Sequence, residues 1–544
     1  MPHTPIKLFS AFVWLMVSVV PGYAQRKTKQ PNIVVLLADD LGWNDLSTNQ
    51  TSLGHGSRYH QTPQIDRLAR QGMSFGSMYA SQNCSPSRAC LLSGQYAPRT
   101  EIYNVGSLNR GDTNSVIKPI PQLTNLKPGI TTLAETLRKA GYVTAHFGKW
   151  HLGASRAIEV EHGFDVSYSG DEFQSRTIDG SGNHFIAEQK APNRWEFNLY
   201  GSHMAQFAQP YTQPYIDAYL QPYANQNNPR SLEGTPKHIN DAMADATADF
   251  LSKQRTKLGQ DKPFLMYVAF QLVHVPIQPR SDLLAKYEQL PLTDPRHVHV
   301  PYAAFVEQLD QVVGRVMDQL KDPNGDGDQS DDVTDNTIVL FLSDNGGPGN
   351  GKKDTPSMNT PLRGYKGTQY EGGIRVPMIV RWPGKIKAGT INHEALHLTD
   401  LYPTLASLAS APLPDRTVQA VDGESFVPIL RSEADSIQRK SLFFHFPGYM
   451  DSRGFPVSVI IRDFGRERYK LFYYYEPQRY ELYRISEDIG EKKDLLADEL
   501  TVSVKTIANT MRDELRQWLE RTKPRPLTYR SDGRAVPLPG LIAK

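Results

Sequence analysis

The chain has very little cysteine and no apolar run long enough to cross a membrane. Of its 544 residues only Cys84 and Cys90 are cysteines. A helix between them would hold their side chains apart, so we do not expect a disulfide. The apolar run at residues 8–20 is shorter than the about 20 residues that a bilayer-spanning helix needs. We therefore expect no stable membrane insertion.

Excess charge of one sign is also absent. The formal net charge is +2, which gives no support to a nucleic-acid-binding surface. Apolar residues at 39% and charged residues at 22% are typical of an ordinary globular protein. Because 544 residues exceed what one hydrophobic core usually supports, we expect at least two domains.

The N-terminus has the pattern of a signal peptide. Lys7 precedes the apolar run 8–20, and small residues then lead to a cleavage position after Ala24. We predict a signal peptide at residues 1–24 and an exported protein, either periplasmic or secreted. An uncleaved membrane anchor is the alternative.

Three short apolar runs predict buried strands, and polar residues follow each of them. The runs with their polar residues are 32–38 with Asp39 and Asp40, 264–270 with His274, and 337–342 with Asp344 and Asn345. Ligands bind beyond the carboxyl ends of the strands in parallel sheets. The polar residues are therefore expected to converge on one site.

Helical patterns alternate with these runs. Residues 63–70 have one apolar face and stop at Gly72. Thr131 or Thr132 is placed to cap a helix that ends at Gly141, before a strand at 142–147. Alternation of strands and helices predicts an α/β fold with a large, mostly parallel or mixed sheet flanked by helices.

Two regions depart from this alternation. Residues 154–262 are polar, aromatic and proline-rich, which predicts a variable insertion within a catalytic domain at 25–434. Its prominent aromatic residues either stack on sugar rings or fasten a long loop to its own domain; they are Trp195, Tyr211, Tyr215 and Tyr223.

From 435 to 544 we predict a smaller domain with an antiparallel sheet (strands near 457–461, 469–474 and 480–483) and a helix at 502–519.

The densest chemical signal lies at residues 84–94, Cys-Ser-Pro-Ser-Arg-Ala-Cys-Leu-Leu-Ser-Gly. Pro86 suits the first turn of a helix and Gly94 its end, which places Cys84 at the N-terminus, where an anion is favoured. Considered alone, this cysteine is either a reactive thiol of low pKa or an inert buried one.

The complete pattern resembles the signature of the formylglycine-dependent sulfatases, members of the alkaline-phosphatase-like superfamily. Cys84, Pro86 and Arg88 carry it, followed by Leu-Leu, Ser and Gly. Further blocks resemble the family in the same order, at residues 31–42, 148–153, 343–347, 361–377 and 481–492. The resemblance covers residues 31–410, with the insertion as its main gap.

The resemblance implies that Cys84 is oxidised to formylglycine (3-oxoalanine) by a formylglycine-generating or an anaerobic maturation enzyme. The aldehyde hydrates to a gem-diol, and one hydroxyl attacks the sulfur of a sulfate ester. The second hydroxyl then allows inorganic sulfate to be expelled, a step that an ordinary serine cannot perform.

The resemblance also implies a cation site. Its ligands are Asp39, Asp40, Asp344, Asn345 and the oxygen of residue 84. Oxygen donors suit Ca²⁺ or Mg²⁺ and argue against zinc; we expect Ca²⁺, the usual ion of the family. Asp344 is a further candidate to accept the proton of the attacking hydroxyl.

Five more residues receive roles from the family pattern. Arg88 holds the modified residue, while Lys149 and Lys366 bind the sulfate oxygens and the leaving oxygen. His151 deprotonates the second hydroxyl, and His274 either protonates the departing alcohol or contacts the sulfate.

Two other features invite a functional interpretation. The acidic segment 322–332 begins like a calcium loop, but Val333 replaces the expected Glu at the twelfth position. We therefore expect a solvated loop, with a weak peripheral Ca²⁺ site as the alternative. His445 either lines the mouth of the site or is a packed structural residue.

The sequence leaves three functions in competition. The favoured one is hydrolysis of a sulfated poly- or oligosaccharide. Its rivals are a phosphate or phosphonate ester hydrolase on the same scaffold and a non-catalytic protein that binds sulfated glycans.

Overall fold

A computed structural model describes Met1 and residues 29–110, 114–153, 158–169, 185–198, 202–259, 262–349, 355–450, 454–497 and 501–542. The predicted signal peptide lies outside the described residues, apart from Met1. No helix in the described ranges combines the length and apolar character needed to span a bilayer.

A nine-stranded mixed sheet forms the centre of the molecule. Its strands, in spatial order, are β12 (Thr390–Asn392), β2 (Met73–Tyr79), β11 (Arg375–Arg381), β10 (Thr337–Ser343), β1 (Asn32–Ala38), β9 (Phe264–Ala269), β5 (Val143–Gly148) and β6 (Val166–Tyr168), and β13 (Leu396–His397) pairs with β2. The run from β10 to β6 is parallel, and β11 is antiparallel to both of its neighbours. The predicted mixed α/β sheet is confirmed.

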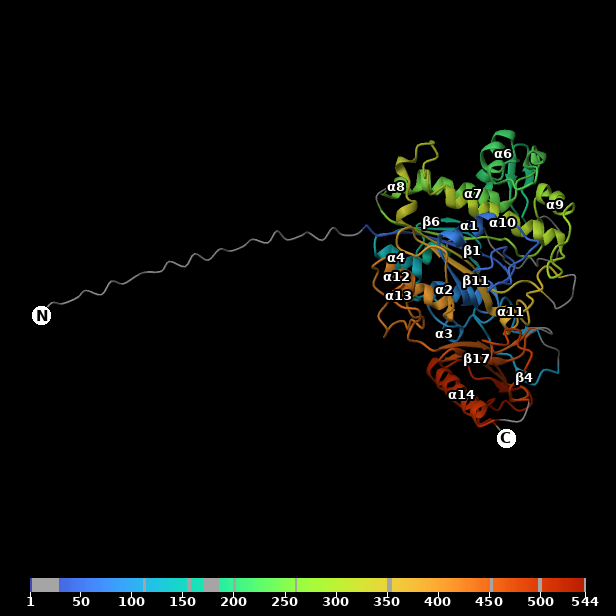
Figure 1. The fold of residues 1–544 in the computed structure, drawn as a ribbon, viewed down its shortest axis with the longest axis vertical. Coiled ribbons are helices and arrows are strands. Elements are labelled where there is room, and N and C mark those ends of the chain that lie inside the picture. The colour runs from blue at the N-terminus through green and yellow to red at the C-terminus, as the bar shows by residue number, and fades with distance from the viewer. Residues whose placement is uncertain are drawn as a thin grey trace.

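Helices cover both faces of this sheet (Figure 1). Alternate residues of β1 belong to different hydrophobic clusters, because successive side chains of a strand point to opposite faces. One face carries α1 (Pro63–Gln71), α7 (Ile239–Asp249) and α10 (Val300–Asp318), and the other carries α2 (Cys84–Ser93), α4 (Leu133–Lys139), α12 (Leu401–Leu408) and α13 (Val427–Leu430). This two-sided cover explains why the central strands are apolar throughout.

Local sequence signals account for the helix ends. Thr132 caps α4 in a capping box with Glu135, and α1 ends at Gly72, as predicted. Gly94 ends α2 with a left-handed conformation (φ 68°), which a glycine adopts without steric strain.

A second, four-stranded antiparallel sheet follows near the C-terminus. It consists of β14 (Ser441–Phe446), β16 (Val457–Phe464), β17 (Glu467–Tyr474) and β18 (Arg479–Tyr483). Helix α14 (Val502–Thr522) packs against it through Met511, Leu515 and Leu519. We propose the domain boundary near residue 435, shortly before β14.

The remaining elements are short. They are α3 (Ala97–Thr100), α5 (Ile158–Glu161), α6 (Gln213–Tyr219), α8 (Arg255–Gly259), α9 (Ser281–Tyr287), α11 (Glu371–Ile374), β3 (Asn109–Arg110), β4 (Ile117–Lys118), β7 (Glu188–Ala191), β8 (Arg194–Glu196), β15 (Tyr449–Met450) and β19 (Thr528–Tyr529).

The tyrosines of the insertion bond to α7 and α10, two helices that cover the sheet. The Tyr211 hydroxyl donates to Asp241 (2.6 Å), and the Tyr215 hydroxyl donates to Asp245 (2.9 Å). Tyr223 reaches across to helix α10, where its hydroxyl bonds Asp318 (3.1 Å). Trp195 packs, partly buried, against the hydrophobic cluster on the same face of the sheet. Of the two interpretations, the structural one fits these aromatic residues.

Candidate active site

The polar residues that follow the ends of the central strands lie close together, as predicted. Strand β1 lies between β10 and β9, and all three run parallel. Asp39 and Asp40 follow β1 directly, and Asp344 and Asn345 follow β10. The Asp40 amide donates to Asp344 Oδ1 (3.2 Å), and Asn345 Nδ2 donates to Asp40 Oδ1 (2.8 Å). His274, beyond β9, lies with Nε2 3.6 Å from Asp40 Oδ2.

Cys84 is the first residue of α2 and lies against this cluster. Its Sγ atom is 3.4 Å from Asp39 Oδ1 and 3.7 Å from Asp40 Oδ1, and the side chain is fully buried. The helix N-terminus therefore directs residue 84 at the carboxylates.

Arg88 lies one helical turn further along α2 and is also fully buried. Its Nε and Nη2 atoms donate to Asp344 Oδ2 at 3.0 and 2.8 Å, and Nη1 donates to the Lys149 carbonyl at 2.7 Å. The guanidinium thereby joins α2 to the turns after β10 and β5. Such a planar fork holds both partners in fixed orientations.

Two lysines face the first carboxylate pair. Lys149 Nζ lies 2.5 Å from Asp39 Oδ2, and Lys366 Nζ lies 2.7 Å from Asp40 Oδ2. The Lys149 side chain is fully buried, whereas that of Lys366 is 16% exposed. Lys366 therefore lies closer to the opening of the site than Lys149 does.

The pKa values of His151 and His274 are both lowered, which favours the neutral imidazole. Burial and the nearby charges of Lys149 and Arg88 lower the pKa of His151 well below its usual value. Burial and the Lys366 charge lower the pKa of His274 to about 4, although Asp40 opposes the shift. A neutral imidazole accepts a proton at one nitrogen and donates a hydrogen bond from the other.

Two acidic groups of the site have pKa values above their usual ones. Burial and the neighbouring Asp39 raise the pKa of Asp344 to about 6, despite Arg88 and Lys149. Burial, Asp344 and Asp39 raise the pKa of the Cys84 thiol well above its usual value. These causes do not favour the alternative in which Cys84 is a reactive thiol of low pKa.

The residues present fit a hard divalent cation. Asp39, Asp40, Cys84 and His274 each offer a ligand atom, and these atoms lie within 4.8 Å of one another. Asn345 Oδ1 is buried without a hydrogen-bond partner in the described part of the chain, although such atoms are normally satisfied. A cation accounts for this oxygen and for the crowded carboxylates. The geometry adds His274 to the groups around this position, whereas the sequence suggested only sulfate or proton chemistry for it.

Two other candidate features lie apart from this cluster. His445 is 5% exposed, bonds Ser458 Oγ through Nδ1 (2.8 Å) and packs edge-on against Tyr103, so it is a packed structural residue. In the acidic segment, the Asp322 carboxylate accepts the amides of Gly325 and Gly327, which agrees with a solvated loop.

The sequence did not lead us to the residues that hold the turns of the site in place. Asp45 is fully buried and bonds the Gly42 amide and the Tyr302 hydroxyl, while Asn359 bonds the backbone of Gly347. An acidic residue shortly after the Asp39–Asp40 pair was the available signal for Asp45.

Comparisons with known proteins agree with this geometry. The family model described as Sulfatase matches residues 31–411, and the one described as N-sulphoglucosamine sulphohydrolase, C-terminal, matches residues 365–521. A "Sulfatase" of Formosa agariphila is 44% identical over 98% of this chain and 98% of its own length. The N-acetylgalactosamine-6-sulfatase of Homo sapiens is 28% identical over 75% of this chain and 67% of its own length.

A solved structure shows the same fold over most of the chain. The crystal structure of Ps i-CgsB in complex with k-i-k-neocarrahexaose has a TM-score of 0.60 and 25% sequence identity. The similarity covers 90% of this chain and 92% of that one. The Sulfatase match, residues 31–411, includes every residue of the predicted site.

Proposed function

Because this chain belongs to the sulfatase family and is a sulfuric ester hydrolase, we propose that it removes sulfate from a sulfated poly- or oligosaccharide. The nucleophile is formylglycine made from Cys84, and the cation beside it is Ca²⁺ rather than Mg²⁺. The observation that carries the proposal is the convergence of Cys84 with the polar ends of β1, β9 and β10.

Residue 84 lies where a nucleophile is needed. As formylglycine it supplies a diol: one hydroxyl oxygen bonds to sulfur while the S–O bond to the alcohol breaks and the alcohol leaves. Deprotonation of the other hydroxyl then restores the aldehyde while the C–O bond to the sulfate breaks and inorganic sulfate leaves. The position at the start of α2 favours negative charge on that oxygen. Arg88 keeps the adjoining turns in place through Asp344 and the Lys149 carbonyl.

The cation is assigned to the carboxylate cluster. Asp39, Asp40, Asp344 and Asn345 hold it together with an oxygen of residue 84, and it supplies positive charge that lowers the pKa of that oxygen and neutralises sulfate. The Asp344 carboxylate, which Arg88 holds in this cluster, is the candidate to take the proton of the attacking hydroxyl.

The histidines divide the remaining proton chemistry. His151, neutral because of its lowered pKa, accepts the proton of the second hydroxyl. For His274, a pKa of about 4, caused by burial and Lys366, leaves little imidazolium near neutral pH. Donation of an N–H hydrogen bond to a sulfate oxygen is therefore its better-supported role.

The lysines supply charge for the substrate. Lys149 and Lys366 contact Asp39 and Asp40, the two carboxylates that lie against Cys84. Their ammonium groups are therefore within the same small region as the nucleophile, where they bind sulfate oxygens and the leaving oxygen.

Relatives support a sulfated carbohydrate as the substrate. The human relative is named for N-acetylgalactosamine 6-sulfate, and the Ps i-CgsB structure contains k-i-k-neocarrahexaose. Export to the periplasm or outside the cell, suggested by residues 1–24, would give the enzyme access to such polymers. Maturation needs a formylglycine-generating or anaerobic enzyme as a partner.

Peptide mass spectrometry across residues 83–88 of protein from the native source tests the proposal. The expected result is a peptide with the aldehyde at position 84. An intact thiol, with binding of sulfated glycans but no turnover, would instead support the non-catalytic binding protein.

Rates on an aryl sulfate and an aryl phosphate with the same leaving group test the reaction itself. We expect the sulfate to be the better substrate of the mature enzyme. A clear preference for phosphate would favour the phosphate or phosphonate ester hydrolase.

A screen of sulfated oligosaccharides tests the substrate class. Activity on small aryl or alkyl sulfates alone would contradict a poly- or oligosaccharide substrate.

A further inference from the structure

The carboxylate of Asp45, on the turn that follows β1, contacts four different groups. Its Oδ2 atom accepts hydrogen bonds from the Gly42 amide (2.8 Å) and the Tyr302 hydroxyl (2.7 Å). Its Oδ1 atom accepts one from the Ser357 hydroxyl (3.0 Å) and lies 3.3 Å from His297 Nε2. Because the side chain is fully buried and both oxygens are occupied, the carboxylate is held in one orientation.

The Ser357 contact leads to the turn after β10. Two residues beyond Ser357, the Asn359 side chain accepts the Gly347 amide and donates to the Gly347 carbonyl, both at 3.2 Å. The Lys366 amide donates to the same carbonyl at 3.1 Å. Since Gly347 lies two residues after Asn345, one set of bonds joins the Asn345 turn, the 357–359 segment and the Lys366 backbone.

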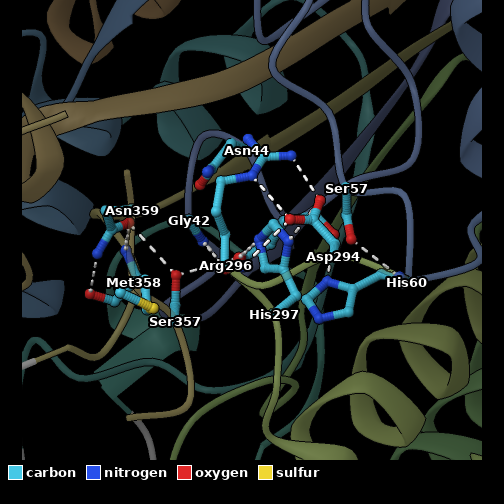
Figure 2. A network of polar contacts seen from close by, with 12 residues as sticks. Gly42, Asn44, Ser57, His60, Asp294, Arg296, His297, Ser357, Met358 and Asn359 are labelled. Carbon is cyan, nitrogen blue, oxygen red and sulfur yellow. Dashed lines mark hydrogen bonds and ion pairs between the residues drawn. The ribbon is translucent and has the colours of Figure 1, made fainter. Parts of the chain in front are cut away.

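The segments in this network approach each other very closely. Figure 2 shows Ser357 and Asn359 on one side of Gly42, and the same segment lies against Gly347. A Cβ atom on Gly42 would lie 2.5 Å from Asp45 Oδ2, and one on Gly347 would lie 2.4 Å from Ser357 Oγ. Neither position accepts a side chain without movement, so the turns are packed in a single register.

A further set of contacts links Asp45 through His297 to the charged residues Asp294 and Arg296. His297 lies between two carboxylates, with Nε2 3.3 Å from Asp45 and Nδ1 3.4 Å from Asp294, and Arg296 pairs with Asp294 at 2.6 Å (Figure 2). Burial alone would raise the pKa of Asp45, but His297, with Nε2 3.3 Å from Oδ1, lowers it below its usual value. The hub of the network is therefore an ionised carboxylate.

We infer that Asp45 is a positioning residue for the cation site, holding the turn of Asp39 and Asp40 in register with the segments that carry Asn345 and Lys366. The inference rests on the proposed function, because it assigns a role toward the proposed cation. Within the described residues no hydrogen bond or ion pair joins Asp45 to a proposed ligand. It acts through Gly42 on one side and Ser357 on the other.

The same cluster resembles a second metal site. Asp45, His60 and His297 each offer a ligand atom, and these atoms lie within 4.8 Å of one another. However, both Asp45 oxygens already accept hydrogen bonds, and the His60 Nδ1 atom lies 2.7 Å from the Asp45 carbonyl. His60 Nε2 and the two His297 nitrogens have no hydrogen-bond partner among the described residues. The contacts of Asp45 itself favour positioning, and an ion bound to the histidines is an outcome that the experiment distinguishes.

Calcium binding to the full chain tests the inference with three variants. Asp45→Asn keeps the volume of the side chain but leaves one oxygen to accept bonds. Ser357→Ala removes only the link to the second turn, so it provides a readout if Asp45→Asn does not fold. Asp294→Asn is the matched control, because this buried carboxylate contacts His297 and Arg296 but neither Gly42 nor Ser357.

Affinity for Ca²⁺ alone is measured by calorimetry, together with turnover of a sulfate ester. We expect Asp45→Asn and Ser357→Ala to weaken calcium binding by about tenfold, or about 1.4 kcal/mol. Excess Ca²⁺ should restore their kcat under conditions where each variant is fully folded; that condition is needed because calcium binding would also stabilise a generally weakened variant. Asp294→Asn should lower thermal stability and leave calcium affinity within about twofold of wild type.

Unchanged calcium affinity in both Asp45→Asn and Ser357→Ala would overturn the inference. Equal weakening in Asp294→Asn would do the same, since it would show a general loosening of the cluster. Elemental analysis that finds a second ion, lost with His60→Ala, would assign the cluster to metal binding instead. A wild-type chain without calcium binding or sulfate turnover would overturn the proposed function as well, whereas an active wild type with unaffected variants contradicts the positioning role alone.

Discussion

Replacing Arg88 with lysine should separate the effect of charge from that of geometry in the candidate site. Lysine keeps the positive charge but not the planar fork. Of three hydrogen bonds, two to Asp344 and one to the Lys149 carbonyl, an ammonium group at this position can replace about one. Hydrogen bonds to charged groups contribute about 1.5–3 kcal/mol each, so losing two costs about 3–6 kcal/mol.

Part of this loss falls on catalysis, because Asp344 and Lys149 flank the nucleophile. If about half of it applies to the transition state, the rate falls by a factor of about 10 to 100. The assay is sulfate release per folded molecule, with the folded fraction and the stability taken from urea unfolding of the same sample.

The matched control is Arg315→Lys. Arg315 is also buried and donates to Asp245 (2.7 Å) and to the Tyr215 hydroxyl (3.1 Å), neither of which is a residue of the candidate site. It should lose stability but keep its activity per folded molecule. The reasoning is refuted if Arg88→Lys retains wild-type activity, or if Arg315→Lys loses as much.

Three further outcomes follow from the structure. Cys84→Ser should release no sulfate over repeated turnovers, because serine lacks the second hydroxyl, whereas Cys90→Ser should remain active; equal activity of the two would contradict the nucleophile. Chelation should abolish sulfate release, and Ca²⁺ should restore it better than Mg²⁺; full activity after metal removal would contradict the cation. Lys470→Met leaves Glu491 buried without its cation, while Glu371 keeps Arg375, and should cost about 3–5 kcal/mol. Burial raises the pKa of Glu491 to about 7, although Lys470 opposes the shift. Without the lysine, the pKa of Glu491 in the folded state rises further above its unfolded value. The stability of the variant therefore falls as the pH increases toward that higher folded-state pKa. The loss, measured by urea unfolding, should therefore be larger near about pH 8 than near about pH 5, and a pH-independent loss would contradict it.

Much of the fold follows from short-range patterns. The apolar run of β1 and the Asp39–Asp40 pair predicted a buried strand with a site at its end. Thr132 and Gly94 predicted helix ends because capping depends on residues a few positions apart. Strand β14 was not predicted, because the run Phe443–Phe444–His445–Phe446 has no alternation of polar and apolar residues.

The support behind the site could not be predicted in the same way. Asp45 meets Tyr302 and Ser357, which lie 257 and 312 residues away in the chain. Tyr302 reads in sequence as an ordinary residue of an amphipathic helix, and Ser357 as a loop residue. Likewise, composition does not show whether Tyr211 faces a ligand or a buried carboxylate such as Asp241; only the tertiary contact decides that.

A crystal structure of the mature, calcium-loaded protein tests the central claim most directly. The account predicts an ion among Asp39, Asp40, Asp344 and Asn345, with two oxygens on the side chain of residue 84 and one of them facing the ion. A thiol at position 84 with no ion among these groups would contradict it.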